Sequence, residues 1–135
     1  MKNALMILLI SFVVGCHATG GRTVPSDRAA IYLGGIAHAE VDACGETYSL
    51  IIQYGEASVP VVTKALDLYA DATNAPTSNC RILNAVMWVY KVQGDSALPT
   101  LNAIMRKAAE SPNPDIKNRG TKWLEWEAGR RQSKH

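Results

Sequence analysis

The densest group of chemically reactive side chains lies between His38 and Glu46, where histidine, acidic residues and cysteine are interspersed with Ala, Val and Gly. Imidazole, carboxylate and thiolate groups bind transition metals and act as general acids and bases. On a helix, however, His38 shares a face with Asp42 and Glu40 shares another with Cys44, because side chains four residues apart lie together. The four groups therefore do not converge on one ion, and we expect no metal site.

Covalent catalysis has no recognisable motif in this chain. Neither Gly-x-Ser-x-Gly nor Ser-x-x-Lys occurs in the sequence. A hydrolase that uses His38 with Glu46 or Asp42 remains an alternative, and it predicts a solvent-filled cleft around His38. Charged residues on exposed helices are common, so the expectation is a protein that is not an enzyme and binds no cofactor.

A group of residues suited to binding lies near the C-terminal end, where Trp123 and Trp126 follow Arg119 and Lys122. Tryptophan and arginine are enriched at the centres of protein interfaces. Two interpretations are open. If both tryptophans are buried, Trp126→Ala lowers the melting temperature. If one stays partly exposed as an anchor for a partner, Trp126→Ala leaves stability unchanged and loses partner binding. These four residues are the candidate partner-binding site, whereas Trp88 has apolar neighbours and is expected in the core.

The elements that position these residues are predicted to be helices. Apolar residues recur at helical spacing, and no alternating β pattern competes with them. Asn74-Ala75-Pro76 and Ser111-Pro112-Asn113-Pro114 interrupt the pattern, and Asn113 before Pro114 is typical of an N-cap followed by proline in the first helical position. Five or six helices are predicted, with apolar stripes over residues 29–37, 44–52, 62–69, 82–90, 98–108 and 116–127.

Two turns of similar sequence lie 39 residues apart, since Gly55–Val62 aligns with Gly94–Leu101. Each turn has a glycine after a helix, an acidic residue, small residues able to cap, and a proline in the first turn of the next helix. Glycine accepts the left-handed conformation at a helix C-terminus, and proline in a first turn forfeits no intrahelical hydrogen bond. The spacing falls just under the periods of HEAT and armadillo repeats.

The stretch from Arg81 through Gly94-Asp95 to Leu101 resembles one HEAT repeat, with a basic residue and small apolar residues on its first helix. The resemblance extends more loosely over residues 41–128, with a third unit that has only its first helix. It implies an all-α fold built as a short array of antiparallel helical hairpins, a HEAT-like α-solenoid. The alternative is a generic helical bundle.

The first residues have the order of an export signal. Lys2 is followed by an apolar run over residues 4–14 and then by Val13-Val14-Gly15-Cys16, which resembles the lipobox of bacterial lipoproteins. The resemblance implies a signal peptide over residues 1–15 and a lipid on Cys16. Because His17 is not aspartate, it also implies sorting to the outer membrane, facing the periplasm. The apolar run is shorter than the roughly 20 residues that span a bilayer.

Two other interpretations of this leader stay open. One is an ordinary secreted protein cleaved near Ala18, with Cys16 incidental, and the other is an uncleaved anchor. The chain has three cysteines, and an odd number in an exported protein leaves one thiol to explain. If Cys16 carries the lipid, Cys44 and Cys80 can form a disulfide in an oxidising compartment. Two buried free cysteines are the alternative.

The length suggests one domain, and the charge is unevenly distributed along the chain. We expect a flexible tether over residues 16–25, a helical domain over residues 26–128 and a basic tail over residues 129–135. Residues 106–135 hold eight Lys or Arg against four Asp or Glu, although the whole chain has a net charge of only +2. The basic end could contact an anionic surface, or it could be a solvated helix face with a tail. Nucleic acid is not expected as a partner of an exported protein.

The resulting functional hypothesis is a lipid-anchored helical scaffold or adaptor of the bacterial cell envelope. Helical arrays bind other macromolecules along their stacked surfaces, so a protein partner is expected. The alternatives are an envelope inhibitor or immunity protein that neutralises a toxin or hydrolase, and the small periplasmic hydrolase described above.

Overall fold

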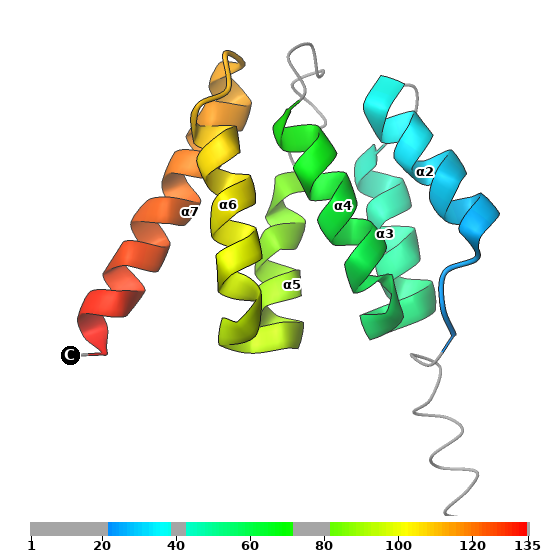
Figure 1. Ribbon diagram of the computed structural model, residues 1–135, viewed down its shortest axis with the longest axis horizontal. Helices are drawn as coiled ribbons and strands as arrows, with labels where there is room; N and C mark the ends of the chain where they lie inside the picture. Colours follow the sequence, from blue (N-terminus) through cyan, green and yellow to red (C-terminus); the bar gives the residue numbers. More distant parts are fainter. Residues whose placement is uncertain (1–21, 39–42, 72–81, 135) are drawn as a thin grey trace, which may run out of the picture.

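The computed structural model describes residues 22–38, 43–71 and 82–134, and all regular secondary structure in these ranges is helical (Figure 1). The predicted all-α class is therefore confirmed. Two short 3-10 turns, η2 and η4, join consecutive helices. The elements in chain order are α2 (Ser26–His38), α3 (Ala43–Tyr54), η2 (Gly55–Ser58), α4 (Val59–Ala70), α5 (Ala85–Gln93), η4 (Gly94–Ala97), α6 (Leu98–Ala109) and α7 (Pro114–Ser133).

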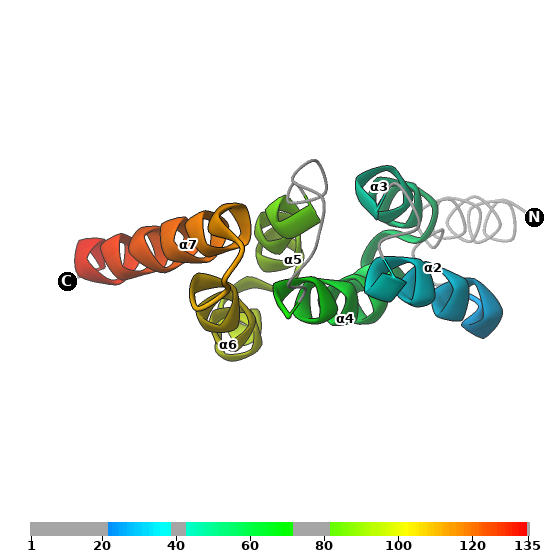
Figure 2. The same cartoon turned by 90° about the horizontal axis from the view of Figure 1, so that it is seen from above.

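The helices form two rows, with α3, α5 and α7 on one side and α2, α4 and α6 on the other (Figure 2). α4 packs against α2 and α6 in its own row and against α5 in the other row. α6 in turn packs most extensively against α7. The apolar core follows the line between the rows, and its largest fully buried side chains are Leu50, Leu66, Ile82, Leu83, Leu101, Met105 and Ile116.

The two similar turns adopt matching conformations. Gly55 and Gly94 both have a positive φ, of 53° and 67°, which a residue with a Cβ rarely adopts. Pro60 and Pro99 each lie in the first turn of the helix that follows, as the sequence predicts. The small residues play a different part from the one expected. Ser58 is at the N-cap of α4, but its hydroxyl donates to the carbonyl of Gly55 at 2.6 Å and does not cap the helix.

The N-terminal helices are tied together by polar contacts as well as by the core. Arg28 of α2 lies over the ring of Tyr54 at 5.3 Å from its centroid, and its guanidinium donates to the Tyr54 hydroxyl at 3.1 Å. The hydroxyls of Tyr32 and Thr47 are hydrogen bonded at 2.5 Å in the buried space between α2 and α3. These contacts fix α2 against the α3–α4 hairpin at the N-terminal end of the fold.

A charge cluster also joins α4 to α6. The Lys107 ammonium lies 2.6 Å from a carboxylate oxygen of Asp67 and 2.9 Å from one of Asp71. Burial by itself lowers the pKa of Lys107, but the hydrogen bonds to the two carboxylates raise it above its ordinary value on balance. The cluster therefore adds a polar contact to the hydrophobic packing between neighbouring helices of one row.

α7 begins where the sequence predicts but ends later. The side chain of Asn113 accepts hydrogen bonds from the amides of Asp115 and Ile116, so the predicted N-cap is confirmed. The helix then continues to Ser133, past the boundary expected at residue 128, and most of the expected tail is helical. The reason is that Glu127 is buried and accepts a hydrogen bond from Arg131 at 2.6 Å, which supports the last turns.

Several sequence predictions fall outside the described residues. They are the signal peptide over residues 1–15, the lipid attachment residue Cys16, and Cys80 of the expected disulfide. Cys44 lies in the first turn of α3, but its side chain is outside the described part of the chain. Within residues 22–38, 43–71 and 82–134, no helix has both the length and the apolar character needed to cross a membrane.

Candidate functional site

The four residues of the predicted partner-binding site line one groove between α5, α6 and α7. Arg119, Lys122, Trp123 and Trp126 lie on one face of α7 because their spacing matches the helical repeat. The groove has a volume of about 380 Å³. We call it the α5–α7 groove; its other lining residues are Leu83, Asn84, Val86, Met87 and Met105.

The two tryptophans of this groove have different environments. Trp123 is only 4% exposed, and its indole nitrogen donates to the Oδ1 atom of Asn102 at 2.9 Å. Trp126 is 38% exposed, and Met87, which the α5 side of the groove contributes, is 37% exposed. Trp123 is therefore part of the structural core, and Trp126 is an aromatic side chain at the surface. Trp88, which the sequence places in the core, is only partly buried against it.

An aromatic cluster holds Trp126 in place. Its ring lies 4.9 Å from that of Trp123 and 5.4 Å from that of Tyr90, measured between centroids, and the contact with Tyr90 is edge-to-face. Such aromatic pairs contribute about 0.5–1.5 kcal/mol beyond the area they bury. Arg130 covers Tyr90 with its guanidinium 5.6 Å from the ring centroid. The exposed tryptophan is therefore packed on one side and open to solvent on the other.

The basic residues of α7 fall into two groups. Near its C-terminal end, Arg130 and Lys134 lie 3.4 Å and 3.0 Å from carboxylate oxygens of Asp95 in η4. Hydrogen bonds from Lys134 and from the hydroxyl of Tyr90 lower the pKa of Asp95 below its ordinary value. Much of the positive charge at this end of the helix is therefore paired with Asp95 within the fold, although the sequence suggests a contact with an external anionic surface there.

The cations at the α5–α7 groove are not neutralised in the same way. Arg119 donates to the uncharged Oδ1 atom of Asn84 at 2.9 Å, which links α7 to the start of α5. Lys122 is exposed and makes no ion pair with any residue of the described ranges. The rim of the groove thus presents two positive charges beside an apolar floor.

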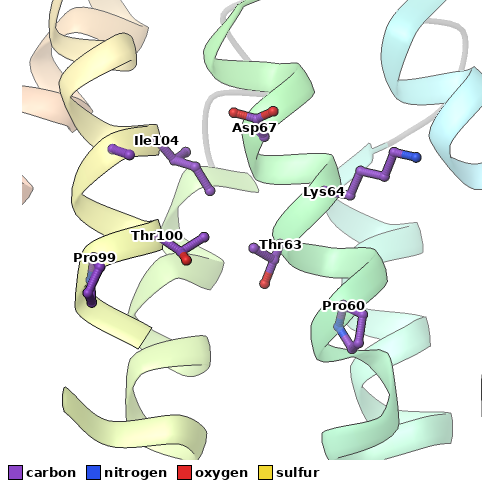
Figure 3. Close-up of a pocket in the computed structure, with 8 residues that line it drawn as sticks. Pro60, Thr63, Lys64, Asp67, Pro99, Thr100 and Ile104 are labelled. Carbon is purple, nitrogen blue, oxygen red and sulfur yellow. The ribbon is translucent and has the colours of Figure 1, made fainter. Parts of the chain in front are cut away.

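A second groove lies between α4 and α6, in the other row of helices (Figure 3). It is larger than the α5–α7 groove, with a volume of about 600 Å³. Thr63 and Thr100 face each other across it, and Pro60 and Pro99 lie at the same end of its two walls. Its charged residues have opposite signs, because Lys64 and Asp67 both line it. We call it the α4–α6 groove.

Sequence reasoning missed the wall of the α5–α7 groove that α5 supplies. Asn84, at the N-cap of α5, and Met87 line the groove, and Tyr90, one helical turn further on, packs against Trp126 of α7. The regular interval between these residues was the available signal, but it does not reveal which later helix faces them. The hydrogen bond between Asn102 and Trp123 is likewise a contact between helices that the sequence leaves unspecified.

Most of the reactive residues near the end of α2 lie outside the described part of the chain. Glu40 and Asp42 lie outside the described residues, as does the side chain of His38, whereas Glu46 is exposed on α3. Among the residues that the structure describes, no three His, Cys, Asp or Glu side chains form a group that could hold a metal ion. The α5–α7 groove is therefore the better-defined candidate site.

Comparison with protein-family models, curated proteins and solved structures finds no match to this chain. The class is consequently defined by the fold and the groove alone: an all-helical protein with an apolar, cation-rimmed surface groove.

Proposed function

We propose that this chain is a lipid-anchored helical adaptor of the bacterial cell envelope that binds a protein partner through the α5–α7 groove. The observation that carries the proposal is the position of Trp126, which is 38% exposed and lies between an apolar floor and the cations of Arg119 and Lys122. Aromatic residues held rigidly at a surface lose little conformational entropy on binding and are frequent interface anchors.

A HEAT-like array is the architecture that we propose for this adaptor. Its support is the pair of hairpins, α3–η2–α4 and α5–η4–α6, whose turns share a positive-φ glycine and a first-turn proline at an interval of 39 residues. The two rows of helices are the arrangement expected when such hairpins stack side by side (Figure 2). In this arrangement α7 takes the place of the first helix of a further unit.

The membrane anchor in the proposal rests on the sequence. Val13-Val14-Gly15-Cys16 resembles a lipobox, and the acyl chains it implies each contribute about 0.8 kcal/mol per buried methylene. Residues 16–25 would then tether the domain close to the membrane surface. Ten residues span at most about 33–36 Å when fully extended, so the adaptor would work within a short distance of the bilayer.

Both halves of the proposal can be tested in one experiment. Cells that express the tagged full chain are labelled with an alkyne analogue of palmitate, and the chain is then captured from envelopes solubilised in a neutral detergent. We expect the native chain to carry the label and to bring down a discrete protein. Cys16→Ala should lose the label, and Trp126→Ala should keep the label but lose the captured protein.

The matched control is Lys64→Ala, which alters an exposed residue of the α4–α6 groove and should keep both label and partner. A membrane-bound native chain without label would contradict lipid anchoring. A partner that Trp126→Ala retains in full, but Lys64→Ala loses, would place binding in the α4–α6 groove and contradict the proposed surface.

A further inference from the structure

We infer that the partner presents an acidic segment to the α5–α7 groove, with one apolar side chain entering the groove and neighbouring carboxylates meeting Arg119 and Lys122. This inference rests on the proposed function and specifies the chemistry of the partner. It is carried by the sign of the charge around the groove, by the composition of its floor, and by the observation that no carboxylate of residues 22–38, 43–71 and 82–134 pairs with Arg119 or Lys122.

The floor of the groove selects an apolar side chain. Leu83, Val86 and Met105 line it and are buried, whereas Met87 and Trp126 also line it and are 37% and 38% exposed. The volume of about 380 Å³ lies near the lower end of the range of roughly 300–1,000 Å³ for small-molecule sites. A groove of that size has room for a large apolar side chain. The methionine can adapt to its shape because its side chain is flexible and polarisable.

The rim of the groove selects negative charge. Among the described residues that line it, none is acidic, whereas Arg119 and Lys122 are cations. Arg119 has a neutral partner in Asn84, and its charge is therefore not cancelled by that contact. Lys122 has no carboxylate partner within residues 22–38, 43–71 and 82–134. A carboxylate of a binding partner would provide the missing counter-charge.

Other cations of the same fold are neutralised by carboxylates of the chain itself. Lys107 has two carboxylate partners, and Arg131 is bonded to the buried Glu127. In the α4–α6 groove, Lys64 shares the lining with the carboxylate of Asp67. Charge of a single sign beside an apolar floor therefore distinguishes the α5–α7 groove from the α4–α6 groove, and it favours an acidic partner.

The arrangement along α7 also fixes how such a segment would lie. Lys122 and Trp126 are four residues apart, as are Arg119 and Trp123, so each cation lies beside an aromatic ring on the same helix face. If an apolar side chain of the partner packs against Trp126, the residues adjacent to it in the partner's sequence come within reach of Lys122. Because these charges are at the surface, their attraction is expected to weaken as salt is added.

The test uses three fluorescein-labelled peptides that differ only in the residues flanking a central leucine: aspartate, lysine or serine. The full chain in neutral detergent micelles is titrated into each peptide, and binding is followed by fluorescence anisotropy. We expect the Asp-flanked peptide to bind about tenfold more tightly than the Lys-flanked peptide at low salt, as two exposed ion pairs would give. The difference should shrink at high salt.

Variants then assign the preference to this groove. Lys122→Glu should reduce or reverse the preference for the Asp-flanked peptide, and Arg119→Gln should weaken it. Lys64→Glu makes the same charge change as Lys122→Glu but lies in the α4–α6 groove, so the preference should be unchanged. Thermal unfolding followed by circular dichroism confirms that each variant is folded before its binding is compared.

Equal binding of the three peptides would overturn the inference, as would a preference that Lys122→Glu leaves unchanged. Binding to vesicles containing phosphatidylglycerol, without binding to any peptide, would assign the groove to an anionic lipid surface and also overturn it. If no peptide preference appears while Trp126→Ala still loses the captured protein, only the acidic chemistry is wrong. If Trp126→Ala also keeps that protein, the proposed function fails with it.

Discussion

Gly120→Ala is expected to lower the free energy of unfolding by about 3 kcal/mol or more, because α7 can no longer approach α6. A Cβ atom at position 120 would overlap the amide nitrogen of Ala109 and lie 2.5 Å from the carbonyl oxygen of Met105. Both are backbone atoms of α6 or its C-terminal end, so they cannot move aside as a flexible side chain could. The helix that carries Trp126 would therefore shift or detach.

The same helix offers a matched control in Gly129, where an added Cβ would have no neighbour within 4 Å. Since alanine favours a helix over glycine by about 1 kcal/mol, Gly129→Ala should leave stability unchanged or raise it. Urea unfolding of the two variants, followed by circular dichroism, measures the difference. If Gly120→Ala proved as stable as Gly129→Ala, the close packing of α6 and α7 would be wrong.

Trp123→Ala is the second substitution with a large expected effect, a loss of about 3–5 kcal/mol of stability. It removes a side chain that is only 4% exposed and leaves the Oδ1 atom of Asn102 in a buried position without its indole donor. An unsatisfied buried acceptor carries a cost of about 1–3 kcal/mol, which overlaps with the loss of packing. We therefore expect Trp123→Ala to lose partner binding because the groove itself collapses.

Trp126→Ala provides the comparison for that variant. The sequence interpretation of Trp126 as an anchor implied unchanged stability, but its 38% exposed side chain packs on Tyr90 and Trp123 on one side, so a loss of about 1–2 kcal/mol is expected. Thermal and urea unfolding should separate the two variants clearly, with Trp126→Ala folded under conditions in which Trp123→Ala is largely unfolded. Equal destabilisation would mean that Trp126 is a core residue and not a surface anchor.

The local features of the fold were predictable because each depends on a short run of sequence. Asn113 before Pro114 gives a capped helix start, and Gly55 and Gly94 give the two turns, since backbone conformation there is set by one or two residues. The helical class follows from the apolar spacing. These predictions required no knowledge of which helices are neighbours.

The end of α7 and the wall of the groove depend on contacts between distant residues, and these were not predictable. The basic residues after residue 128 look like a solvated tail in the sequence. In the fold, they are held by Glu127 within the helix and by Asp95 from a distant turn. Likewise, Asn84 meets Arg119 only because α5 and α7 lie in the same row. Such pairings are set by tertiary packing.

Only the part of the candidate site that lies on one helix could be predicted from the sequence, for the same reason. Arg119, Lys122, Trp123 and Trp126 lie on one helix, so their spacing already places them on one face. Which tryptophan would be exposed was left open, because that depends on the depth to which α7 packs against α6. Gly120 determines that depth through its close contact with the α6 backbone.

The central claim, that the α5–α7 groove is the surface that binds a protein partner, is tested most directly by photo-crosslinking in intact cells. A photoreactive amino acid is introduced into the full chain at position 126, with positions 125 and 64 as controls. Glu125 is exposed on α7 but does not line the groove, and Lys64 lies in the α4–α6 groove. If the partner binds in the α5–α7 groove, position 126 should give one discrete crosslinked protein and the control positions little. Equal crosslinking from all three positions, or crosslinking from position 64 alone, would contradict it.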